Sequence, residues 1–273
     1  MTRSVRRTRR ILQLAGAGAA ALMALSACSS SSDSKDAAAS PDASTSLKLS
    51  GDVTVFAAAS LKESFSALGK EFENKHPGTK ISFNFGGSDT LAASITGGAP
   101  ADVFAAASPR TMKIVTDKGD ATGTPATFVR NQLEIATLPG NPDKVSSLKD
   151  LTTSGLKVVL CDKTVPCGAA VQKALDAGKL KLTPASYEQD VKSALNKVEL
   201  KEADAAVVYK TDVKAAGGKV EGVEFPESAK AINDYPIALL KNAPNAETAK
   251  AFIALVRSAE GQKVLSEAGF LKP

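Results

Sequence analysis

Two serines, each placed where a predicted strand leads into a predicted helix, are the residues best suited to bind a ligand. Ser60 follows Ala57-Ala58-Ala59, and Ser88 follows Gly86-Gly87. A serine hydroxyl can donate a hydrogen bond, and the start of a helix offers unpaired N–H groups and a dipole that favours an anion. The small residues before each serine let a ligand approach the backbone closely. Helix capping explains either serine alone, but two such junctions in one chain indicate an anion site.

A third loop carries two cysteines, Cys161 and Cys167, between a predicted strand and a predicted helix. Pro166 suits the first turn of that helix, and Gly168 keeps its start accessible. We expect the two cysteines to form a disulfide, because they are the thiols that remain in an exported chain once Cys28 is assigned to lipidation, as argued below. A two-ligand metal site and a reactive thiol are rival interpretations, but two sulfurs without a nearby histidine do not complete a zinc shell.

A fourth loop, Glu188–Lys192, opens another predicted helix, and Tyr209 ends an apolar strand. Ligand sites in parallel sheets lie beyond the carboxyl ends of the strands. The hydroxyl of Tyr209 is therefore expected at the same edge as the other loops. Packing at a domain boundary is the alternative role for this tyrosine.

The elements that position these loops alternate along the chain. Apolar and alternating segments predict strands at 52–56, 80–85, 101–106, 132–137, 156–160, 205–209 and 237–240. Helical periodicity predicts helices at 61–75, 90–95, 168–178, 187–198 and 246–260, and one after Pro109. This alternation is typical of βαβ units, so we expect an α/β fold with mixed, mainly parallel sheets.

The N-terminus has the features of an export signal. Five arginines and no acidic residue lie in Met1–Arg10, and an apolar stretch, Ile11–Leu25, follows. This stretch is short for a membrane-spanning helix, which needs about 20 apolar residues. Leu25-Ser-Ala-Cys28 resembles a lipobox, so residues 1–27 are predicted to be a signal peptide and Cys28 the acylated N-terminus. Arg9-Arg10 leaves twin-arginine export open as an alternative to the general route.

The segment after Cys28 and the charge balance bear on the possible partners. Residues 28–49 are rich in Ser, Ala, Asp and Pro, which predicts a disordered linker that ends at the membrane anchor. The formal charge of the chain is +5, and the five signal arginines account for all of it. The mature chain is thus near neutral and carries no basic run, which argues against nucleic acid as a partner.

The motifs, in this order and spacing, resemble the substrate-binding proteins of molybdate ABC transporters. The resemblance extends from about residue 51 to 271. It is carried by Val55–Leu61, Gly87–Leu91, Gly98–Phe104, Val165–Gly168, Gln189–Val191 and Ala203–Tyr209.

This family pattern implies a two-lobed fold of the type II periplasmic-binding-protein class, with a hinge between the lobes. Lobe 1 would comprise residues 50–130 and 236–273, and lobe 2 residues 131–235. The chain would cross between the lobes near Phe128–Leu133 and Ile232–Ile237. The implied protein is a monomer without a cofactor or catalytic activity, held by Cys28 at the extracytoplasmic face of the cell membrane. It would deliver molybdate or tungstate to the membrane permease of an ABC importer.

The resemblance also implies which groups hold the oxyanion. The hydroxyl and N–H groups of Ser60 and Ser88, the N–H groups of Cys167 and Val191, and the hydroxyl of Tyr209 would surround it. The protein would supply no direct ligand to the metal atom within the oxyanion.

Two residues depart from the family pattern. Cys167 stands where relatives often have alanine, which is compatible with binding because the backbone donates. Asp89 stands beside Ser88 where a small polar residue is common. A carboxylate aimed at a dianion would repel it, so we expect Asp89 to face solvent in the first turn of its helix.

The expected donor set bears on selectivity among oxyanions. It contains hydrogen-bond donors and no acceptor, so it disfavours phosphate, which carries an O–H near neutral pH. Sulfate carries no proton, and its rejection would depend on cavity size. A sulfate-type oxyanion-binding protein of an ABC importer therefore remains the main alternative. Molybdate and tungstate are too alike in size to be separated.

An enzyme of the same two-lobed fold is a further alternative. His76 is the only histidine, at a predicted helix end beside Pro77, so no Ser-His-acid triad can be built around it. Asp102, Asp190 and Asp204 lie in loops or at strand starts, where we interpret them as structural caps. Iron carriers of this architecture use several tyrosines, and amino-acid binders place an arginine in the site. Neither pattern is present in the candidate loops.

Overall fold

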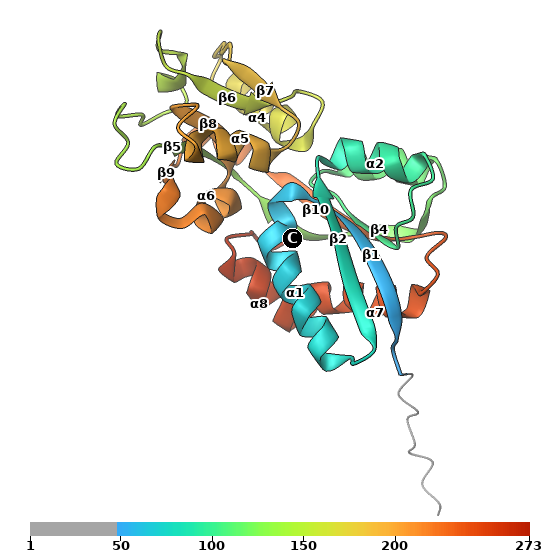
Figure 1. Cartoon of the computed structure of the whole chain (residues 1–273). Helices are drawn as coiled ribbons and strands as arrows, with labels where there is room; N and C mark the ends of the chain where they lie inside the picture. The colour runs from blue at the N-terminus through green and yellow to red at the C-terminus, as the bar shows by residue number, and fades with distance from the viewer. Residues whose placement is uncertain (1–47) are drawn as a thin grey trace, which may run out of the picture. The chain divides into compact units, whose positions relative to one another are not determined.

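The computed structural model describes residues 48–273, which form two five-stranded sheets with helices packed against them (Figure 1). The predicted signal peptide, Cys28 and all but the last two residues of the predicted linker lie outside the described residues. No helix between residues 48 and 273 is long and apolar enough to cross a membrane.

The first sheet, sheet A, has the strand order β2-β1-β3-β10-β4. Its strands are β1 (Gly51–Ala58), β2 (Thr79–Gly86), β3 (Val103–Ala105), β4 (Ala121–Asn131) and β10 (Asn233–Leu240). Strand β1 pairs in parallel with β2 and β3, whereas β10 is antiparallel to β3 and β4.

Helices cover both faces of sheet A. They are α1 (Lys62–Lys75), α2 (Ser88–Thr96), α3 (Pro109–Asp117), α7 (Ala246–Arg257) and α8 (Ala259–Glu267). The apolar stripe of α1, including Phe65 and Phe72, packs with Val53 and Val55 of β1 and with Phe252 of α7. On the other face, Phe56 packs with residues of α2 and α3. Sheet A and these helices are called lobe A.

The second sheet, sheet B, has the strand order β7-β6-β8-β5-β9. Its strands are β5 (Leu133–Thr137), β6 (Val158–Cys161), β7 (Ser186–Glu188), β8 (Ala205–Tyr209) and β9 (Glu221–Val223). Strand β6 is parallel to β7 and β8, and β5 is antiparallel to β8 and β9. Sheet B and helices α4 (Pro166–Ala177), α5 (Val191–Glu199) and α6 (Lys210–Ala216) are called lobe B.

Four short 3₁₀ helices complete the described elements. They are η1 (Ala59–Leu61), η2 (Asp150–Thr152), η3 (Gly217–Lys219) and η4 (Pro226–Lys230). The core of lobe B is built mainly from Val, Leu, Ile and Ala, as the lack of tryptophan in the chain requires.

The chain passes between the sheets along two neighbouring strands. Strand β4 ends at Asn131 and β5 begins at Leu133, while β10 begins at Asn233 after η4. Asn131 and Asn233 are partners in the β4–β10 ladder. The side chain of Asn131 also reaches lobe B, because its Nδ2 donates to Oγ1 of Thr211 at 2.8 Å. The two crossings therefore form one antiparallel pair, which is the connection expected of a hinge.

The predicted α/β class with mixed sheets is confirmed. The sheets are not mainly parallel, because β10 and β5 each run antiparallel to both of their neighbours. Several boundaries also need correction. Strand β4 was not predicted, because Gly123, Pro125 and exposed threonines conceal its period. It lies at the edge of sheet A, where a proline is tolerated. The helix predicted from 187 begins only at Val191, because Asp190 caps it and 186–188 form β7. The helix predicted at 246–260 ends at Arg257, because Ser258 caps a new helix.

Candidate functional site

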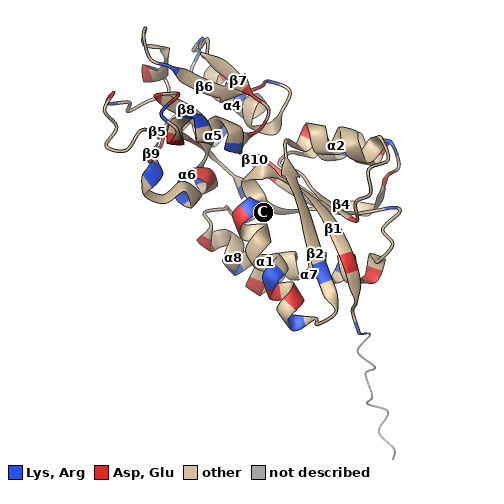
Figure 2. Ribbon diagram, viewed as in Figure 1, with Lys and Arg blue, Asp and Glu red and all other residues tan. Residues whose placement is uncertain are grey.

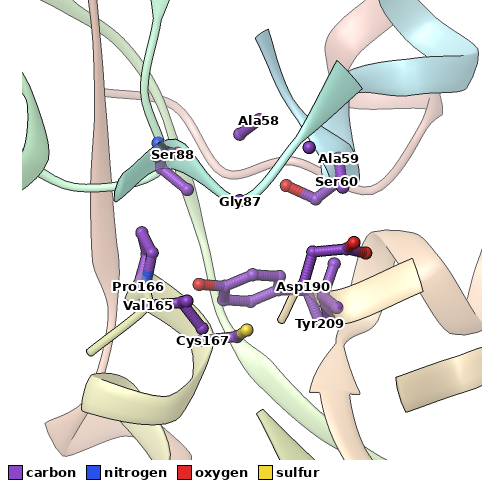
Figure 3. A pocket seen from close by; sticks show the side chains of 13 residues that line it. Ala58, Ala59, Ser60, Gly87, Ser88, Val165, Pro166, Cys167, Asp190 and Tyr209 are labelled. Carbon is purple, nitrogen blue, oxygen red and sulfur yellow. Dashed lines mark hydrogen bonds between the residues drawn. The ribbon is translucent and has the colours of Figure 1, made fainter. Parts of the chain in front are cut away.

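All five residues predicted to hold a ligand line one small cavity. The lining contains Ser60, Ser88, Cys167, Val191 and Tyr209. Ser60 and Ser88 come from lobe A, and the other three come from lobe B. Figure 3 shows Ser60 and Ser88 on one side of this space and Tyr209 and Cys167 on the other.

Helix starts supply the backbone donors of the cavity. Ser88 is the first residue of α2, Val191 is the first of α5, and Cys167 is the second of α4. The first N–H groups of a helix have no partner inside the helix, and the helix dipole adds positive potential there. Three helix N-termini therefore converge on one point, which makes the cavity suited to an anion.

Neither serine acts as a helix cap. The hydroxyl of Ser60 is hydrogen-bonded to the hydroxyl of Tyr235 at 2.9 Å. The N–H of Ala107 donates to Oγ of Ser88 at 3.0 Å. Both serines are almost fully buried. The capping interpretation, which was the alternative for both residues, is therefore wrong.

Tyr209 is buried at the end of β8, and its hydroxyl accepts a hydrogen bond from Nδ2 of Asn233 at 2.7 Å. Burial, and secondly the nearby Tyr235 hydroxyl, raise the pKa of Tyr209 well above its ordinary value. Tyr209 therefore stays neutral and keeps its proton. Because Asn233 already donates to its oxygen, the proton of Tyr209 is available to a ligand.

The cavity lining contains no lysine, arginine or histidine and a single acidic residue, Asp190. The carboxylate of Asp190 caps α5, where it accepts from the N–H groups of Lys192 and Ser193 and from the Ser193 hydroxyl. Figure 3 shows this carboxylate directed away from the Tyr209 hydroxyl. The lysines and arginines of the described residues are scattered over the helices and loops of both lobes (Figure 2). The structural role predicted for Asp190 is therefore confirmed.

The prediction that Asp89 faces solvent needs correction. Asp89 is half-buried, and its Oδ1 is buried without a hydrogen-bond partner among the described residues. This oxygen lies beside Gly87, whose backbone faces the carbonyl oxygen of Gln189 in lobe B. Close packing of the two lobes at Gly87 thus shields the carboxylate from water. Asp89 does not line the cavity.

The loop between β6 and α4 is closed by a disulfide between Cys161 and Cys167, with their Cα atoms 5.9 Å apart. Pro166 begins α4 as predicted. Gly168 has a different role from the one expected, because a Cβ there would lie 1.9 Å from the carbonyl oxygen of Asp162. This glycine permits the tight turn of the disulfide loop rather than keeping the helix start open.

Other candidate residues of the sequence lie away from the cavity. His76 ends α1, and its ring packs on Phe72 with centroids 4.6 Å apart. Asp102 accepts from the N–H of Thr54 in β1, and Asp204 accepts from that of Lys157 next to β6, so each carboxylate joins two neighbouring strands. Among residues 48–273, no three His, Cys, Asp or Glu side chains are grouped for metal binding.

Several residues behind the cavity were not predicted. Tyr235, Asn131 and Asn233 lie on the hinge strands. Tyr235 and Asn233 bind the hydroxyls of Ser60 and Tyr209 from behind, and Asn131 donates to the hydroxyl of Tyr235. Lys192 forms ion pairs with Glu63 at 2.9 Å and with the buried Asp212 at 3.2 Å. The sequence did contain one indication of these residues. Asn131 and Asn233 are polar residues at the predicted crossings between the lobes, next to strands that are otherwise apolar.

Comparisons with known proteins agree with this geometry. Residues 53–271 match the model of the bacterial extracellular solute-binding protein family. The molybdate-binding protein ModA of Mycobacterium tuberculosis is 42% identical over 221 residues, which cover 81% of this chain and 85% of the relative. ModA of Escherichia coli is 32% identical, with 81% and 89% covered.

A solved structure shows the same fold. The periplasmic molybdate-binding protein of Azotobacter vinelandii superposes with a TM-score of 0.71 at 20% identity, covering 81% of this chain and 99% of that one. A family match over most of the described residues and a relative at 42% identity lead to one conclusion. The chain belongs to the bacterial extracellular solute-binding proteins, in the branch that contains the molybdate-binding proteins ModA.

Proposed function

We propose that this protein captures molybdate or tungstate outside the cytoplasm and delivers it to the permease of an ABC importer. The observation that carries the proposal is the cavity where three helix N-termini and three hydroxyls meet without a cation. The relatives named as molybdate-binding proteins support the choice of anion. The proposal includes lipid anchoring at Cys28, a linker from there to about residue 49, a monomeric state and no catalytic activity.

The anion would be held by donors alone. The groups proposed are the hydroxyls of Ser60, Ser88 and Tyr209 and the N–H groups of Ser60, Ser88, Cys167 and Val191. A hydrogen bond to a charged group contributes about 1.5–3 kcal/mol, so several of them can hold a dianion without a lysine or arginine. The helix N-termini add to this attraction.

Both lobes contribute donors, so we infer that the lobes close over the anion around the β4–β10 hinge. The contacts between the lobes support this inference. The guanidinium of Arg110 in α3 donates to the carbonyl of Thr164 in the disulfide loop, and Lys192 of α5 pairs with Glu63 of α1. A closed form of this kind excludes water from the anion and presents one shape to a permease.

Calorimetry of the protein with molybdate, tungstate, sulfate and phosphate tests the proposal. We expect tight, nearly equal binding of molybdate and tungstate, much weaker binding of sulfate and the weakest binding of phosphate. Tight sulfate binding would favour the alternative, a sulfate-type oxyanion-binding protein. Failure to bind molybdate would overturn the proposal.

A double variant tests the proposed residues. Ser60→Ala with Ser88→Ala removes two hydroxyl donors and should weaken molybdate binding about 100-fold or more. Ser82→Ala with Ser266→Ala, two exposed serines of lobe A, is the matched control and should bind like the unaltered protein. Unchanged affinity of the first variant would show that the anion binds elsewhere.

A further inference from the structure

The three hydroxyls of the cavity share one feature: each oxygen has a hydrogen-bond partner on the side away from the cavity. For Ser88 the donor is the backbone N–H of Ala107. For Ser60 and Tyr209 the donors come through two asparagines, Asn131 and Asn233, which face each other in the β4–β10 ladder. The direction of each hydrogen bond decides whether a hydroxyl can accept from a ligand or only donate to it.

Asn233 fixes the direction at Tyr209. Its Nδ2 lies 2.7 Å from the Tyr209 hydroxyl and 3.3 Å from the carbonyl oxygen of Pro166. A carbonyl oxygen can only accept, so the amide nitrogen must face it, and the same nitrogen then donates to Tyr209. The proton of Tyr209 is left for the cavity. If a ligand donated to this oxygen, the buried proton would have to turn toward Tyr235, whose oxygen already accepts from Asn131.

Asn131 fixes the direction at Ser60 through Tyr235. Its Oδ1 accepts from the N–H of Gln132 at 3.0 Å, so its Nδ2 is the atom that faces Tyr235, at 3.3 Å. Tyr235 is fully buried, and two hydroxyls can accept its proton: that of Ser60, at 2.9 Å, and that of Tyr209. Because the Tyr209 oxygen already accepts from Asn233, the Tyr235 proton is assigned to Oγ of Ser60. The proton of Ser60 is thereby turned toward the cavity.

We propose that Asn131 and Asn233 are specificity-determining positioning residues, which make the hydroxyls of Ser60 and Tyr209 donors only and so exclude oxyanions that carry a proton. This inference rests on the proposed function and extends it from the residues that touch the anion to the hinge strands behind them. The ligand class it selects is the fully deprotonated tetrahedral oxyanion. Hydrogen phosphate and hydrogen arsenate are rejected because their O–H meets no acceptor.

Asn233→Asp reverses the hydrogen bond while keeping the shape of the side chain. The carboxylate accepts a hydrogen bond from Tyr209, and the tyrosine oxygen then offers a lone pair to the cavity. Asn233→Leu is the matched control, because it loses the same contacts to Tyr209 and Pro166 without adding an acceptor. Asn131→Asp and Asn131→Leu repeat the comparison on the Ser60 side, and melting temperatures identify any variant that does not fold.

The readout is the ratio of the dissociation constants for sulfate and hydrogen phosphate at about pH 8, where both anions are mainly dianions. Added negative charge repels the two equally, so the ratio reports the direction of the hydrogen bond alone. In the aspartate variants we expect the dissociation constant for sulfate, divided by that for hydrogen phosphate, to rise about tenfold. This change corresponds to one hydrogen bond gained by phosphate. The leucine variants should weaken the binding of both anions by the same factor, so their ratio should not change.

Two results separate this inference from the proposed function. If the unaltered protein binds molybdate but the ratio is the same in the aspartate and leucine variants, the asparagines are only structural and the inference is wrong. If the unaltered protein does not bind molybdate, the proposed function itself fails.

Discussion

Lys192 of lobe B and Glu63 of lobe A form an ion pair at 2.9 Å between α5 and α1. The same ammonium group lies 3.2 Å from the buried carboxylate of Asp212. Burial opposes the charge of Lys192, but the two carboxylates outweigh it and raise its pKa. One lysine thus neutralises a buried acid in its own lobe and reaches across to the other lobe.

Glu63→Gln should weaken molybdate binding by about two- to fivefold, because the pair forms only when the lobes are together. Glu63 is half exposed, so the ion pair contributes at most about 1 kcal/mol. The dissociation rate, measured by stopped flow, should rise while the melting temperature without ligand stays the same. Glu202→Gln breaks a pair with Lys197 inside lobe B and is the control. Equal effects of both variants would rule out a role in closure.

Gly87→Ala should abolish tight anion binding without destabilising the separate lobes. A Cβ on Gly87 would lie 2.6 Å from the carbonyl oxygen of Gln189, which belongs to the other lobe. The methyl group therefore holds the lobes apart rather than disrupting a core. Calorimetry should show the loss, and thermal unfolding without ligand should be nearly unchanged. Gly218→Ala, where a Cβ meets nothing within 4 Å, should leave binding intact.

The free energy of unfolding should fall as the pH rises from about 4 to about 7, because Asp212 loses its proton in this range. Burial, opposed by Lys192, raises the pKa of Asp212 from 3.8 to about 6. The folded state therefore holds this proton more tightly than the unfolded state does. The stabilisation is fully present below pH 3.8 and is lost as the pH rises through about 6. The shift corresponds to about 3 kcal/mol.

Asp212→Asn removes the titrating group. The free energy of unfolding, measured with urea at several pH values between about 4 and about 7, should then depend less on pH. A variant whose pH dependence matches that of the unaltered protein would show that another group is responsible.

Reduction of the Cys161–Cys167 disulfide should lower stability by about 2 kcal/mol, the value expected for so short a loop. The double variant Cys161→Ala with Cys167→Ala should unfold at the same lower temperature and should not respond to reductant. Anion binding should survive in the variant, because the proposed donor at position 167 is the backbone N–H. Loss of binding together with the disulfide would mean that the covalent closure itself shapes the site.

The local parts of the site could be predicted from sequence because their signals are short-range. Ser60 and Ser88 stand at strand-to-helix junctions, and Tyr209 ends an apolar strand, so each could be placed at the ligand-bearing edge. The pairing of Cys161 with Cys167 followed from the expected export and from the assignment of Cys28 to lipidation.

The residues behind the cavity could not be found in this way. Tyr235 contacts Ser60 across 175 positions, and Asn131 contacts Tyr235 across 104. No local pattern encodes such contacts. Strand β4 was missed because it lies at the edge of the sheet and contains a proline. Its sequence therefore lacks the alternation of apolar and polar residues that marks a half-buried strand. The partial burial of Asp89 arises where the lobes meet, which a pattern within one helix does not contain.

The edge-to-face pair of Tyr209 and Tyr235, with ring centroids 6.1 Å apart, has a spectroscopic consequence. The chain has no tryptophan and only three tyrosines, and the third, Tyr187, is 44% exposed in lobe B. The near-ultraviolet emission of the protein therefore comes from two rings beside the cavity and one ring in solvent. An anion that accepts a hydrogen bond from Tyr209 changes the environment of the first two rings and leaves the third as a constant background. The unlabelled protein thus carries its own optical reporter of occupancy.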